Sequence, residues 1–173
     1  MNITQKTFIG WSLAILPILM TALWMYIWVG VGGGADDGSK AFLDKVAEGA
    51  TINKLLISIA GVSFTFVVAS FVMFSRGVGA DSDNPFLGNF SALLLLISGT
   101  VNLFGANSFV SALSYHGTEA AEALTIFVAG TTDLGVMDIV FGIALIALGR
   151  AIRDANNKLE PAILLNIVSF GFL

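Results

Sequence analysis

The chain has 173 residues, of which 56% are hydrophobic and 12% are charged. A soluble domain carries about 25% charged residues to keep its surface in water, so the composition excludes a soluble protein and predicts one integral membrane domain over residues 1–173. The net charge of −4 and the lack of a basic cluster exclude nucleic acid as a partner. There is no cysteine and one histidine, so thiolate metal sites and bis-histidine haem sites cannot be built from this chain alone. We therefore expect no cofactor and no resident metal.

Four apolar segments are long enough to cross a bilayer as helices, which takes about 20 residues. They cover about 8–31, 55–75, 90–113 and 123–149. The first carries Trp11 near one end and Trp24, Tyr26 and Trp28 near the other, as expected of a full crossing, because aromatic rings favour both interfaces. It is longer than the core of a signal peptide, so we expect an uncleaved anchor.

A fifth apolar run begins at residue 162 and stops at Leu173. Its twelve residues would reach only about 18 Å as a helix, against a hydrocarbon core of roughly 30 Å. We therefore expect a truncated or incompletely assigned chain, with a half-helix as the alternative. The predicted fold is an all-α polytopic transmembrane helical bundle with four complete spans and a fifth begun.

A glycine-rich link follows the first span and leads into a segment with helical spacing of apolar residues. These are Phe42, Leu43, Val46 and Ala50. The spacing predicts a short amphipathic helix over about 40–54, lying on the membrane surface. The glycines are not a phosphate-binding loop, because the lysine and hydroxyl residue that end such a loop are absent.

Lysine and arginine counts predict the orientation of the spans. One side carries Lys6, Arg76, Arg150, Arg153 and Lys158, and the other carries Lys40, Lys45 and Lys54 among several acidic residues. The bias predicts a plasma (inner) membrane protein with a cytoplasmic N-terminus. Loops 32–54 and 114–122 would then face outward.

Two carboxylates, Asp133 and Asp138, lie inside the fourth span. A charge in hydrocarbon costs about 2.5–3.5 kcal/mol on insertion scales, so such residues are candidates for function. Asn102 lies near the middle of the third span, at a matching depth. We predict that Asn102, Asp133 and Asp138 form an intramembrane polar or ion site. No lysine or arginine lies within a span, which leaves protonation, contact with water or a cation, or a basic residue of another subunit.

The two carboxylates do not share a helix face. They are five residues apart, which places their side chains about 140° apart around a helix. Asp138 shares its face with Gly135, Gly142 and Gly149, a series that lets helices approach closely. We therefore expect this face to pack against another helix. Asp133 lies in the stretch 130–135, whose glycines and threonines could interrupt the helix, and it is the better candidate for a hydrated or ion-linked role.

Small and polar residues also form stripes on the second and third spans. They are Ser58, Gly61, Thr65 and Ala69 on the second, and Ser98, Asn102 and Gly105 on the third. These stripes predict that spans two, three and four meet along a partly polar seam. Residues 57–61 resemble residues 126–130, which favours a duplicated hairpin or else reflects chance similarity of apolar helices.

His116, Glu119 and Glu122 follow the third span. They are candidates for a metal or proton-sensing site in an outer loop, with a solvated loop as the alternative. No Ser–His–Asp or His-Glu-x-x-His pattern is present, so we do not expect an enzyme acting alone.

Two functions are left open. The first is a structural or accessory subunit of a larger membrane complex, with the lipid bilayer and other membrane subunits or further copies as partners. The second is a small channel or secondary transporter for protons or cations that uses Asp133 and Asp138. A subunit of a membrane enzyme whose metal ligands come mostly from other chains is a third, less favoured possibility.

Overall fold

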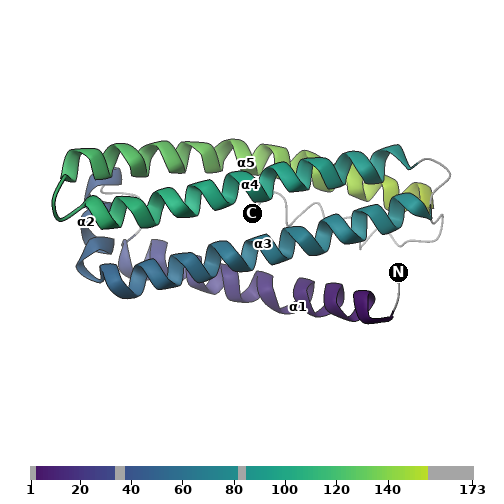
Figure 1. Cartoon of the computed structure of the whole chain (residues 1–173), viewed down its shortest axis with the longest axis horizontal. Coiled ribbons are helices and arrows are strands. Elements are labelled where there is room, and N and C mark those ends of the chain that lie inside the picture. Colours follow the sequence, from purple (N-terminus) through teal and green to yellow (C-terminus); the bar gives the residue numbers. More distant parts are fainter. Residues whose placement is uncertain (1–2, 34–37, 82–84, 156–173) are drawn as a thin grey trace.

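The computed structural model describes residues 3–33, 38–81 and 85–155 of the chain, which are helical and contain no strand. The elements are α1 (Ile3–Met25), the π-helical turn η1 (Tyr26–Val31), α2 (Gly38–Glu48), α3 (Ala50–Ala80), α4 (Phe86–Tyr115) and α5 (Ala120–Ala155) (Figure 1). The candidate membrane spans among them are Thr4–Val31, Ala50–Ala80, Phe86–Tyr115 and Ala120–Ala155. Each contains one predicted complete span, so the predicted all-α helical bundle is confirmed. The fifth run, from residue 162, lies outside the described residues.

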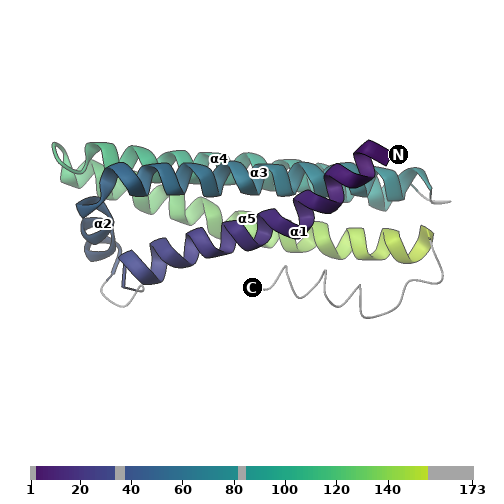
Figure 2. The ribbon, with the colours of Figure 1, turned by 90° about the horizontal axis from the view of Figure 1, so that it is seen from below.

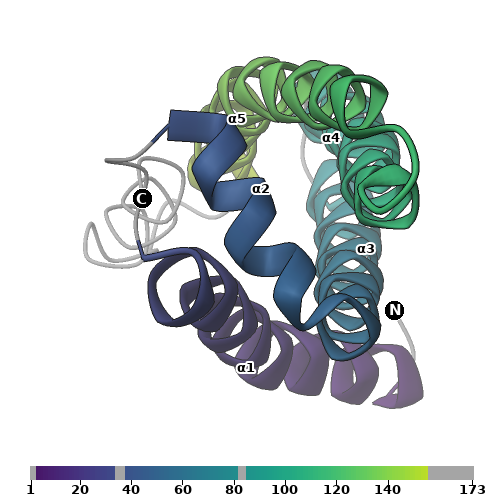
Figure 3. The ribbon, with the colours of Figure 1, turned by 90° about the vertical axis from the view of Figure 1, so that its left-hand side faces the viewer.

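The long helices form an open arc rather than a closed bundle (Figure 3). Helix α3 packs on α4 and α4 packs on α5, whereas α1 packs mainly on α3. Figure 2 shows α1 running obliquely across α3. Short connections favour antiparallel pairing of neighbouring helices, which explains this order. As a result, α1 and α5 are the two edges of the arc.

Glycines bring α3 and α4 into close contact along their whole length. A Cβ atom at Gly61 would lie 2.8 Å from Ala106 Cβ, and one at Gly99 would lie 2.9 Å from Val68 Cγ1. At the far end, a Cβ at Gly88 would lie 2.7 Å from the Cα of Gly79. No larger residue fits these points without separating the helices, which is how membrane helices associate without a hydrophobic driving force.

Helix α2 closes one end of the arc (Figure 3). Its residues Phe42, Leu43 and Val46 are buried, and the ring of Phe42 stacks on Trp28 and on Phe127, with centroid distances of 4.3 and 5.6 Å. The predicted amphipathic helix therefore forms, but it ends at Glu48, and residues 50–54 begin α3. Its apolar side packs against the ends of the long helices rather than lipid, because their aromatic side chains provide a dense apolar surface there.

Helix α5 is continuous through residues 130–135, so the predicted interruption is not observed. The hydroxyl of Thr131 donates to the carbonyl of Phe127 at 3.1 Å, and that of Thr132 donates to the carbonyl of Val128 at 2.9 Å. These bonds satisfy the threonines within the helix itself, and the backbone needs no outside partner.

The two similar segments, residues 57–61 and 126–130, both reach α4 through their final glycine. Gly61 faces Ala106, and a Cβ at Gly130 would lie 2.6 Å from Ser108 Cβ. The segments thus approach α4 at nearly the same level from two helices. A duplicated hairpin would place Gly61 against the preceding span, as Gly130 is, so this shared contact with α4 does not support duplication. It follows from the need for glycine wherever helices touch.

Candidate functional site

Asn102 lies in the seam between α3 and α4 and is 3% exposed. Its side-chain amide donates to the carbonyl oxygen of Gly61 at 3.4 Å. The predicted stripes meet here as expected for Gly61, Ser98, Asn102 and Gly105, which are buried, whereas Ser58 is exposed and donates to the carbonyl of Lys54. Asn102 therefore binds α3, and the structure does not place it against Asp138.

The side chain of Asp138 is exposed, and we call the exposed face of α5 around Gly135 and Asp138 its outer side. On the same side of the helix Ile139 is 66% exposed, and no atom lies within 4 Å of a Cβ at Gly135. The side chain of Asp133 lies outside the described residues. This part of α5 thus exposes the carboxyl group of Asp138 and, at Gly135, backbone that no described atom covers.

The glycine series on α5 changes its surroundings along the helix. Gly149 is buried, Gly142 is half-buried and Gly135 is exposed. A seven-residue repeat drifts by about 20° per heptad around a straight helix, and the outer side of α5 has no neighbour among the described helices. The predicted packing face of Gly135, Gly142 and Gly149 is therefore fully buried within this chain only at Gly149.

Buried serines join the long helices at points that the sequence analysis did not single out. Ser91 on α4 donates to the carbonyl of Ala144 on α5 at 2.8 Å, and Ser75 on α3 donates to the carbonyl of Gly88 on α4 at 3.0 Å. Ser70, at 0% exposure, has no hydrogen-bond partner among the described residues. The signal available in the sequence was a serine about one helical turn from a close-packing glycine, as Ser91 is from Gly88 and Ser75 is from Gly79, which predicts proximity but not the partner.

His116 contacts α2 instead of the acidic residues near it in sequence. Its Nε2 atom lies 2.7 Å from Asp44 Oδ1, and Lys40 Nζ donates to Asp44 Oδ2, also at 2.7 Å. Hydrogen bonds from Lys40 and then His116 lower the pKa of Asp44, so the carboxylate accepts and the imidazole donates. Glu119 and Glu122 are exposed. The described residues contain no cluster of three or more metal-ligating side chains.

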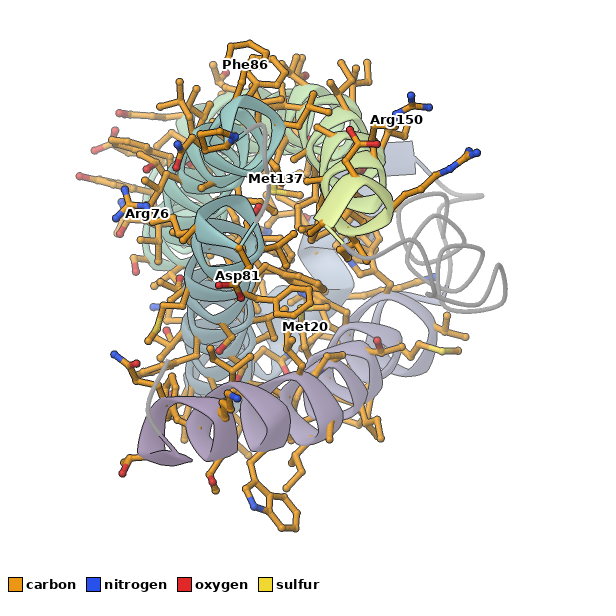
Figure 4. The ribbon with its side chains drawn as sticks, turned by 90° about the vertical axis from the view of Figure 1, so that its right-hand side faces the viewer. Met20, Arg76, Asp81, Phe86, Met137 and Arg150 are labelled. Carbon is orange, nitrogen blue, oxygen red and sulfur yellow. The ribbon has the colours of Figure 1, made fainter. Side chains whose placement is uncertain are left out.

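The described basic residues divide between the two ends of the arc: Lys6, Arg76, Arg150 and Arg153 lie opposite α2, and Lys40, Lys45 and Lys54 lie at the α2 end. Figure 4 looks at the end opposite α2 and labels Arg76 at the end of α3 and Arg150 near the end of α5. Met20 and Met137 lie toward the interior in the same view, packed with an apolar cluster that includes Phe64. The described basic residues therefore lie at the two ends of the long helices. The middle of the arc is apolar apart from the groups described above.

No protein-family model, curated protein or solved structure matches the chain. Its assignment therefore rests on its own residues and geometry. The four long apolar helices indicate a membrane protein and fit a lipid bilayer environment.

Proposed function

We propose that the protein is a structural or accessory subunit of a larger membrane complex. The observation that carries this proposal is the exposure of Asp138 on the outer side of a membrane-spanning helix. A carboxyl group that faces lipid costs free energy, and intramembrane ionisable residues almost always face protein or a water-filled cavity. Contact with another membrane protein would remove this cost.

The open arc supports the same proposal. Apolar residues on α1 such as Trp11 and Ile18 are 65% and 72% exposed, and α5 exposes Ile139 and Ile146. Lipid satisfies apolar side chains equally well, so this exposure alone does not require a partner. What distinguishes α5 is the combination of an exposed carboxyl group with an open glycine, which favours a close helix contact.

We also propose the plasma membrane as the location, with the N-terminus on the cytoplasmic side. Support comes from a modest bias in basic residues: Lys6, Arg76, Arg150 and Arg153 lie at the end of the arc opposite α2, against Lys40, Lys45 and Lys54 at the α2 end, which is the direction of the positive-inside rule. Labelling of an introduced cysteine at Thr118 with an impermeant reagent in intact cells tests this orientation. Labelling only after cell lysis would contradict it.

Purification of the tagged protein from its native membrane in a mild detergent, followed by native mass spectrometry, tests the main proposal. We expect stoichiometric partner subunits with the unaltered chain and their loss with Asp138→Leu. Asn107→Leu is the matched control, because Asn107 is also polar and exposed but lies on α4. A homogeneous monomer would contradict the proposal, as would partner binding that survives Asp138→Leu.

Reconstitution of the purified chain into liposomes tests the transport alternative. An accessory subunit alone should give no proton or cation flux above empty liposomes. Flux that Asp138→Asn abolishes and Asn107→Leu preserves would favour a channel or transporter instead.

A further inference from the structure

We infer that the partner subunit contacts α5 with a transmembrane helix that carries a lysine or arginine at the depth of Asp138. This inference rests on the proposed function and specifies the chemistry of the partner. It follows from three features of α5: the depth of Asp138, the positions of the basic residues of this chain, and the open backbone at Gly135.

Contacts between α4 and α5 define the depth of Asp138. Gly130 lies against Ser108 on one side of it, and Ala144 accepts the hydrogen bond of Ser91 on the other. Because α4 and α5 run antiparallel, Asp138 is level with the region of Ser98, near the middle of α4 (Phe86–Tyr115). The carboxyl group thus lies close to the centre of the membrane, where it cannot reach the aqueous interface along the helix.

No basic residue of the described chain lies at this depth. Arg150 is twelve residues beyond Asp138 on α5, a rise of about 18 Å. On α3 the same level is near Val68, which faces Gly99, and Arg76 lies about 12 Å further along. A second copy inserts in the same orientation, so it would bring its own Asp138 to this depth and set two like charges together. Because the described residues offer no counter-charge at the depth of Asp138, we place that charge on a different protein.

The surface around Asp138 suits a helix rather than a loop or a small ion. Gly135 is about one helical turn from Asp138 and has no atom within 4 Å of its Cβ position, so a second backbone can approach closely there. Exposed Ile139 and Ile146, which lie on the same side of the helix as Gly135, provide apolar contact beside it. A helix packed on these residues would direct a long basic side chain at the carboxylate and exclude lipid from both charges.

Model transmembrane peptides in liposomes test the inference. The unaltered chain contains no cysteine, so a donor dye on an introduced cysteine at exposed Thr118 labels it at one site. Acceptor-labelled leucine–alanine peptides of about 21 residues carry lysine, leucine or aspartate at the centre. We expect energy transfer to show at least tenfold tighter binding of the lysine peptide than of the leucine peptide. Asp138→Asn should remove this preference, and Asp138→Lys should transfer it to the aspartate peptide.

Asn107→Leu is the control variant and should keep the preference for lysine. Equal binding of the lysine and leucine peptides would overturn the inference. Energy transfer between donor- and acceptor-labelled copies of the protein that is lost in Asp138→Asn would also overturn it, because a second copy would then occupy the face. If native purification still yields partner subunits that depend on Asp138, failure of the peptides refutes only the basic residue and leaves the accessory role standing.

Discussion

Replacing Gly88 with alanine should force α3 and α4 apart at the end of the arc opposite α2. A Cβ at this position would lie 2.7 Å from the Cα of Gly79 and 2.7 Å from the carbonyl oxygen of Ser75. Ordinary contacts of a Cβ begin at 3.4 Å, and both atoms belong to backbone that cannot rotate away. The helices must therefore separate, which also strains the hydrogen bond from the Ser75 hydroxyl to the Gly88 carbonyl.

The size of the effect follows from three opposing contributions. Overpacking costs about 1–3 kcal/mol, and a buried hydrogen bond between membrane helices contributes about 0.6 kcal/mol. The higher helix propensity of alanine than of glycine stabilises the helix by about 0.8–1.0 kcal/mol. We therefore expect Gly88→Ala to lower the free energy of unfolding by about 0.6–2.8 kcal/mol.

Equilibrium unfolding in mixed detergent micelles, followed by tryptophan fluorescence, measures this difference. Gly10→Ala is the matched control, because no atom lies within 4 Å of a Cβ at Gly10, and it should leave stability unchanged or raise it. Ser75→Ala removes the hydrogen bond without a clash and should cost less than Gly88→Ala. If Gly88→Ala and Gly10→Ala have equal stability, the close contact between α3 and α4 does not hold the hairpin together.

Two further predictions concern the end closed by α2. Hydrogen bonds from Lys40 and then His116 lower the pKa of Asp44, so the stabilising contribution of this carboxylate should be complete above its unfolded-state pKa and disappear as the pH falls through its folded-state pKa. Unfolding measured from pH 6 to pH 2 should therefore show a smaller loss of stability for Asp44→Asn than for the unaltered chain. Identical curves would contradict this. Phe42→Ala should destabilise the contact of α2 with the long helices by about 3–5 kcal/mol, so hydrogen exchange should rise in α2 while α4 stays protected. Phe86→Ala is the control, because Phe86 is 63% exposed. Equal exchange in α2 for both variants would argue against the packing of Phe42 on the long helices.

Much of the fold could be predicted because a bilayer imposes a length and an apolar composition on each span. The second span, predicted over 55–75, lies within α3, which runs from Ala50 to Ala80. The helix is longer because hydropathy marks only the most apolar part, whereas the helix continues through polar residues such as Asn53, whose side-chain amide donates to the carbonyl of Val46 at 2.7 Å. The helix at α2 was predictable from its periodicity, but its apolar face matched lipid and protein equally well.

The candidate site was less predictable. Periodicity placed Asp138 and Gly135 on one helix face, and that relation holds in any arrangement of the helices. It did not indicate that the outer side of α5 lacks a neighbour in the described chain. The partner of Asn102 could not be predicted either. The depth of a residue along its span indicates which residues lie at the same level, but it does not indicate which helix is adjacent. His116 found Asp44, 72 residues away in sequence, and no local spacing could predict that pair.

The membrane environment, the helical spans and the residues that share each helix face could be read from local composition and the fixed helical period. The open arc of the described helices, the position of α2 over one end of it, the exposure of Asp138 and the contact of Asn102 with α3 became known from the packing of the helices. The reason is that glycine contacts such as Gly61 with Ala106 and Gly79 with Gly88 select neighbours by shape, and shape is defined only when two helices meet.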